Sequence, residues 1–123
     1  MTSAATALSE LHRALDAPRG GSVVSGNWRW TVRQQMRAVR AVLMLESEHP
    51  DDAWLSARRG MALRERRALL ARIGALEPEV LQCPDLEDVR NQGLRLLTDI
   101  NHHLQRLRDL AYDDVELELG GSE

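Results

Sequence analysis

The chain has 123 residues, 43% of them hydrophobic, and a formal net charge of −3. This length and apolar content suit one domain with its own core, and the acidic balance disfavours nucleic acid as a partner. The single cysteine, Cys83, excludes an intrachain disulfide and a zinc site made of several cysteines. No stretch approaches the roughly 18 apolar residues of a membrane span, and the N-terminus does not resemble a secretory signal. We therefore expect a cytoplasmic protein with no membrane partner.

The first two predicted elements are helices separated by a glycine-rich loop. A short helix, capped by Ser3 or the threonine before it, is predicted to end near Asp16. The stretch 18–26 holds three Gly, two Ser and one Pro, and it is predicted to be a loop. Asn27 is then a plausible cap for a second helix over residues 28–48. This helix has apolar residues on two faces, as expected of a helix that contacts several neighbours or a second chain.

The third predicted helix begins near Asp51, directly after Pro50. Proline disfavours helical geometry in the residue before it, so Pro50 stops the second helix, and Asp51 can cap the third. The apolar pattern continues to about Leu76. We expect the third helix to end there, because Glu77-Pro78 begins a new connection.

The fourth predicted helix is the longest, and the other helices should largely serve to cover it. Apolar residues recur in it at steps of three and four, which places them on one helix face. They are Leu86, Val89, Gly93, Leu97, Ile100, Leu104, Leu107 and Ala111. Gly93 can admit a neighbouring helix closely. After Tyr112 the period changes, because Val115, Leu117 and Leu119 alternate with acids as residues of a strand do.

These elements predict an all-α fold. Four helices joined by short connections form an up-and-down antiparallel four-helix bundle, with one short N-terminal helix and three long helices. We assign residues 1–119 to this single domain and 120–123 to a flexible C-terminal end. Because the first helix is short, an apolar stripe left uncovered would favour a homodimer.

Carboxylate and imidazole side chains form one candidate chemical site. Glu46 and His49 have the Glu-x-x-His spacing of di-iron bundle sites, and Asp99 and His102 have the aspartate counterpart. His103 flanks the apolar stripe of the fourth helix and can face the core, whereas His102 should point to solvent. Such ligands suit iron, manganese or zinc. The alternative is that no cofactor binds and that His103 is hydrogen-bonded to a neighbouring residue.

A second set of candidate residues lies on surfaces that could bind a protein. Arginines form a narrow basic stripe on the second helix, and the acids of the fourth helix are natural partners for the arginines of the bundle. The C-terminal segment can dock into a partner or fray at the end of the chain. The predicted interaction surface comprises Trp30, Arg33, Arg37, Arg40, Tyr112, Val115, Leu117 and Leu119.

The first functional hypothesis is a protein–protein interaction or adaptor module that binds a protein partner or itself. Enzymatic activity is not expected, because the sequence has no nucleophile–base pair, phosphate-binding glycine loop or dinucleotide fingerprint. One alternative is a metal-binding bundle of ferritin-like or hemerythrin-like character. A second alternative is a ligand-binding regulator with a pocket near Trp28, Trp30 and Trp54.

Overall fold

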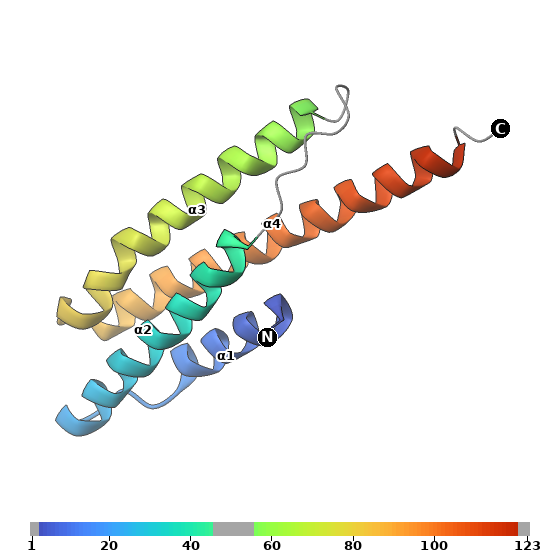
Figure 1. The fold of residues 1–123 in the computed structure, drawn as a ribbon. Helices are drawn as coiled ribbons and strands as arrows, with labels where there is room; N and C mark the ends of the chain where they lie inside the picture. The colour runs from blue at the N-terminus through green and yellow to red at the C-terminus, as the bar shows by residue number, and fades with distance from the viewer. Residues whose placement is uncertain (1–2, 46–55, 121–123) are drawn as a thin grey trace.

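The computed structural model describes residues 3–45 and 56–120, and every regular element in these ranges is a helix. The helices are α1 (Ala4–Asp16), α2 (Ser22–Met44), α3 (Ser56–Gln82) and α4 (Leu86–Gly120). Each helix packs against the next, and α1 also contacts α4, which closes the bundle (Figure 1). The predicted all-α four-helix bundle with a short first helix is confirmed.

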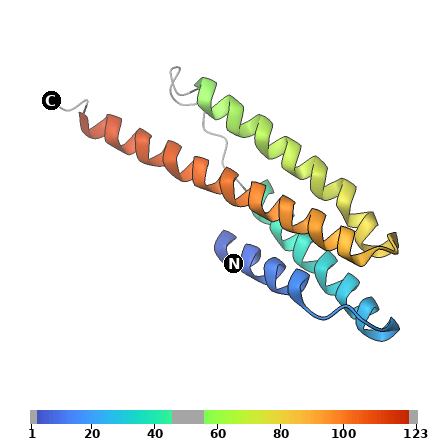
Figure 2. The same ribbon diagram turned by 180° about the vertical axis from the view of Figure 1, so that it is seen from behind.

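The length of α4 sets the shape of the molecule. Its 35 residues span roughly 50 Å at about 1.5 Å per residue, whereas the 13 residues of α1 span roughly 20 Å. Both views show the C-terminal part of α4 projecting past the ends of α1 and α2 (Figures 1 and 2). Among the described helices, none has a stretch that is both long enough and apolar enough to cross a membrane.

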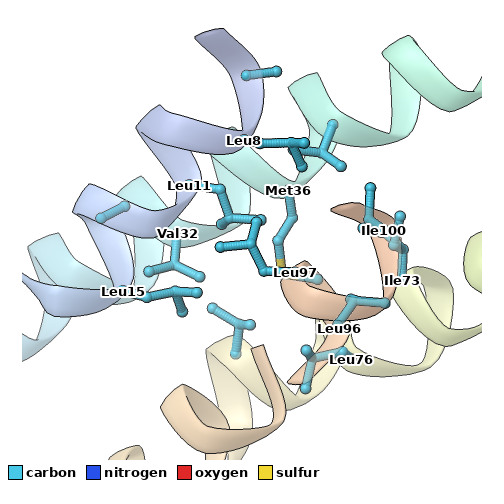
Figure 3. Close-up of a cluster of buried hydrophobic side chains, with 14 of the residues drawn as sticks. Leu8, Leu11, Leu15, Val32, Met36, Ile73, Leu76, Leu96, Leu97 and Ile100 are labelled. Carbon is cyan, nitrogen blue, oxygen red and sulfur yellow. The ribbon is translucent and has the colours of Figure 1, made fainter. Parts of the chain in front are cut away.

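The core lies where all four helices face one another. Leucines of α1 meet Val32 and Met36 of α2 on one side, while Ile73 of α3 and Ile100 of α4 lie on the other (Figure 3). The predicted stripe of α4 is buried at Val89, Gly93, Leu97 and Ile100 and half-buried at Leu86, Leu104 and Leu107. Leu96 is also buried, so α4 buries a wider face than the stripe alone.

Gly93 lets α1 approach α4. A Cβ atom at this position would lie 2.8 Å from Cδ2 of Leu15, which is closer than carbon atoms pack without displacement. Leu15 is 1% exposed and is held within the core. The missing side chain therefore brings the two helices together, as the sequence suggested.

Side chains cap the starts of α1 and α4, and the sequence predicted the first of these caps. The Oγ of Ser3 accepts a hydrogen bond from the backbone N–H of Thr6 at 3.1 Å, at the start of α1. The Oδ1 of Asp85 accepts one from the backbone N–H of Asp88 at 3.1 Å, at the start of α4. Both bonds satisfy donors that the first helical turn leaves without an intrahelical acceptor.

The predicted start of the second helix is wrong, because α2 begins at Ser22 and not after Asn27. The preceding residue, Gly21, has φ 85°, a left-handed conformation that glycine adopts without a steric penalty. Its carbonyl accepts the backbone N–H of Ser25 at 2.8 Å. Gly26 therefore lies inside the helix, where it costs about 1 kcal/mol against alanine. The predicted end near Glu48 lies outside the described residues.

The predicted end of the third helix is also wrong, because α3 continues past Leu76 to Gln82 and contains Pro78. Proline lacks the N–H that would bond to the carbonyl one turn earlier, which normally disfavours it inside a helix. Here Val80 is fully buried, and its carbonyl accepts a hydrogen bond from Arg29 Nη1 of α2 at 2.9 Å. Packing beyond the proline outweighs the lost bond. The predicted start near Asp51 lies outside the described residues.

The strand-like pattern after Tyr112 does not produce a strand, because α4 continues to Gly120. Glu and Leu are strong helix formers, and a single strand without a partner leaves its backbone groups unpaired. The helix satisfies these groups internally, so the local propensity decides the outcome.

Candidate functional site

The predicted metal ligands are only partly brought together. Asp99 faces α3, where its Oδ2 accepts a hydrogen bond from Arg72 Nη1 at 2.6 Å. His102 is exposed and His103 is fully buried, so the two histidines point in different directions. Glu46 and His49 lie outside the described residues. In the described ranges no three His, Cys, Asp or Glu side chains are placed to hold a metal ion. The metal site stays a prediction.

His103 instead belongs to a hydrogen-bonded cluster between α3 and α4. Its Nδ1 lies 2.6 Å from Oε1 of Glu65, and an ionised carboxylate can only accept, so Nδ1 carries the proton and donates it. Arg106, three residues further along α4, donates from Nε to Oε1 at 3.0 Å and from Nη2 to Oε2 at 2.5 Å. The forked arginine and the imidazole thus share one carboxylate, a charge-assisted arrangement stronger than a neutral hydrogen bond.

The electrostatics of this cluster favour the ionised carboxylate. Burial by itself would raise the pKa of Glu65, but hydrogen bonds from Arg106 and His103 and their positive charges outweigh it and hold the pKa below its usual value. In the same way, the bond to Glu65 raises the pKa of Arg106. The cluster therefore fixes a buried polar side chain and joins two helices by charge.

Sequence reasoning placed His103 toward the core but missed Glu65 as its partner. A signal was present, since Glu65 is the only acid between Asp52 and Glu77 and lies among arginines. Acids of the fourth helix were expected to pair with arginines of the second and third helices. Arg72 of α3 and Asp99 form such a pair, whereas Arg33, Arg37 and Arg40 of α2 pair with no described acid.

The outer side of α2 carries an apolar and basic surface. Trp30, Arg33, Arg37, Arg40 and Met44 recur at steps of three and four, and we call them the outer strip. Trp30 is 61% exposed and Met44 62%. Five of the eight large apolar side chains that are exposed in the described part of the chain belong to residues 23–45. The opposite face of α2 is buried, so this helix is apolar on two faces, as predicted.

The three arginines of the outer strip differ from the other charged groups around them. Arg29 donates to the carbonyl of Val80, whereas Arg33, Arg37 and Arg40 form no ion pair with any side chain that the structure describes, in 3–45, 60–110 or 112. The segment 17–45 contains no Asp or Glu, so α2 itself supplies no counter-charge. Like charges one helical turn apart repel each other, so an acidic group bound to the strip would relieve this repulsion.

The predicted residues at the end of α4 lie on its projecting part. Tyr112 is 64% exposed. The backbone at Val115, Leu117 and Leu119 is helical and continues away from α1 and α2 (Figure 1). These positions therefore belong to a helix that extends past the part of the bundle where α1 and α2 cover it.

The tryptophans do not converge on one pocket. Trp28 is buried, and its Nε1 donates to the carbonyl of Leu15 at 3.4 Å, whereas Trp30 faces outward. Trp54 lies outside the described residues. An open groove of about 580 Å³ lies elsewhere, between α3 and α4, and the sequence did not indicate it. It is lined by Arg72, Ala75, Leu76, Glu79, Gln92, Arg95 and Leu96, a set of mixed charge that favours no single ligand class.

Comparisons of the chain with protein-family models, with characterised proteins and with solved structures find no significant match.

Proposed function

We propose that this protein is a protein–protein interaction module and that the outer strip of α2 is its binding surface. The observation that carries the proposal is the exposed Trp30 on the same strip as Arg33, Arg37 and Arg40, none of which pairs with a described acid. Tryptophan and arginine are the side chains that contribute most often to the binding energy of protein interfaces. An apolar and basic strip on a helix fits an acidic amphipathic helix as its partner.

The position of the strip supports recognition by packing along α2. Trp30 and Met44 lie at its two ends, 14 residues or about 21 Å apart, with the arginines between them. Apolar contacts at both ends can anchor a partner helix, while the charges set its direction and register. Exposed ion pairs contribute only about 0–1 kcal/mol each, so the apolar ends should supply most of the affinity and the arginines most of the selectivity.

A photo-reactive amino acid in place of Trp30 tests this proposal in the cells that produce the protein. We expect irradiation to yield a cross-linked species of defined mass. The matched control carries the same group at Ala71, an exposed position on α3 outside the strip, and should give no such species. The absence of a product at position 30, or equal products at both positions, would contradict the proposal.

A further inference from the structure

We propose that the partner is a second copy of this chain. In this dimer the C-terminal end of α4 from each copy lies antiparallel along the outer strip of the other. This inference rests on the proposed binding function of the strip and adds the identity of the partner. The segment involved is residues 109–120, which we call the acidic extension. Its charges, its length and its place at the end of the bundle each support the assignment.

The charges of the two surfaces are complementary. The acidic extension contains Asp109, Asp113, Asp114, Glu116 and Glu118 and no basic residue. The segment 17–45 contains five arginines and no acid. Asp109 accepts a hydrogen bond from the side chain of Gln105 at 3.1 Å but pairs with no described cation. By its sequence each chain thus carries one acidic and one basic surface, and the three arginines of the basic one pair with no described acid.

The acids of the extension occupy the unfavourable end of a helix. A helix carries partial negative charge at its C-terminus, where acids are repelled and bases are stabilised. The last turn of α4 contains no basic residue. The extension is also rich in apolar residues, including Tyr112, Val115 and Leu119. An arginine-bearing surface beside it would offset the repulsion and cover apolar area in the same contact.

The two surfaces are similar in length. The 12 residues 109–120 span about 18 Å as a helix, and the outer strip from Trp30 to Met44 spans about 21 Å. The two helices run in the same direction, and α4 continues past the end of α2 (Figure 1). When two bundles meet end to end, the acids of each extension can therefore lie along the arginines of the other copy's outer strip.

This arrangement has twofold symmetry and closes on itself. The extension projects where α1 and α2 have ended (Figure 2), so two bundles can approach end to end without their cores overlapping. A twofold axis perpendicular to the helices then places each extension beside the partner's α2. Each copy gives one extension and receives one, which limits the assembly to two chains.

Charge reversal in the full-length chain tests the inference. The first variant is R33E/R37E/R40E, and the second is D113R/D114R/E116R/E118R. We expect light scattering after size-exclusion chromatography to show a dimer for the wild type and a monomer for each variant, with the dimer dissociation constant raised at least tenfold. Mixing the two variants restores both charge pairings, so native mass spectrometry should then show a heterodimer. The matched control, R64E/R67E/R95E, reverses three exposed arginines outside the strip and should stay dimeric.

The outcomes separate this inference from the proposed function. Loss of the dimer in R33E/R37E/R40E but not in the extension variant would overturn the extension as the occupant and leave the strip as an interface. A wild type that is monomeric at high concentration overturns the dimer, while a cross-link from position 30 to a different protein would still support the module. If either multiple variant loses its helicity, the single pair R37E and E116R replaces it, with the same expected loss and the same recovery on mixing.

Discussion

His103 Nδ1 on α4 lies 2.6 Å from Glu65 Oε1 on α3, and this contact places a fully buried imidazole against a carboxylate that Arg106 also holds. The contact is a second polar link between α3 and α4, in addition to the ion pair of Arg72 and Asp99. Several consequences for stability can be measured.

The substitution Glu65→Ala should destabilise the fold by about 1–3 kcal/mol, because it leaves the buried Nδ1–H of His103 without this acceptor and Arg106 without its carboxylate. Urea unfolding followed by circular dichroism measures the change. Glu79→Ala, an exposed glutamate on the same helix, is the control and should change stability by less than about 0.5 kcal/mol. Equal effects of the two substitutions would show that the cluster contributes nothing to stability.

Acid should weaken the protein through Glu65. Its pKa in the folded state is held below its usual value of 4.5, despite burial, by Arg106 and His103. The stabilisation is therefore present above pH 4.5 and is lost as the pH falls through the lower, folded-state pKa, because the unfolded chain takes up the proton first. Asp16, whose pKa is lowered by its hydrogen bond to Arg90, acts in the same direction.

The variant Glu65→Gln separates the two acids. It removes one titrating group, so the free energy of unfolding should depend less steeply on pH in the acid range than in the wild type. Unfolding measured at several pH values between about 2.5 and 7 gives this slope. Identical slopes for the wild type and the variant would assign the acid sensitivity to Asp16 and other carboxylates.

Gly93→Ala and Gly74→Ala should have opposite effects on stability. A Cβ atom at position 74 meets nothing within 4 Å, so alanine there should stabilise α3 by about 0.5–1 kcal/mol through helix propensity. A Cβ atom at position 93 would lie 2.8 Å from a methyl group of Leu15, which is packed in the core. Displacing that side chain should cost about 1–3 kcal/mol and outweigh the propensity gain. Thermal unfolding of both variants compares them, and similar melting temperatures would argue against a close approach of α1 to α4.

Ile100→Asp should prevent folding, because Ile100 is 1% exposed and the substitution buries a charge without a partner. Circular dichroism should show the loss of native helicity in this variant. Asn101→Asp places the same side chain on the exposed neighbouring residue and should leave the helicity intact. Soluble, fully helical Ile100→Asp protein would mean that the assigned core face of α4 is wrong.

Helix caps and apolar periodicity predicted the fold, because both depend only on residues a few positions apart in the sequence. Ser3 could be identified as a cap from its place before the first apolar repeat, and the buried face of α4 followed from steps of three and four. The prediction failed at Gly26 and Pro78, where a residue that disfavours helices lies inside one. At Pro78 the deciding term is the burial of Val80, which depends on other helices. At Leu117 and Leu119, the alternation of apolar and acidic residues predicted a strand. The high helix propensity of Glu and Leu instead extends α4 through this segment.

The candidate surfaces could be predicted only where they depend on a single helix. The two apolar faces of α2 and the arginine stripe follow from the sequence alone, since both are properties of one helix. That Arg33, Arg37 and Arg40 pair with no described acid, while Arg72 pairs with Asp99, depends on which helices are neighbours. The groove between α3 and α4 depends on the same arrangement, and no single segment of the sequence predicts it.

The sequence by itself determined that this chain forms helices and which face of each is apolar, because helix periodicity and capping are set by residues within one or two turns. Only the tertiary structure decided that His103 meets Glu65, that Leu15 packs over Gly93 and that Trp30 faces outward. These outcomes depend on how far each helix slides and turns against its neighbours. Close packing of the whole core sets that register, since a shift of one residue would bury different side chains.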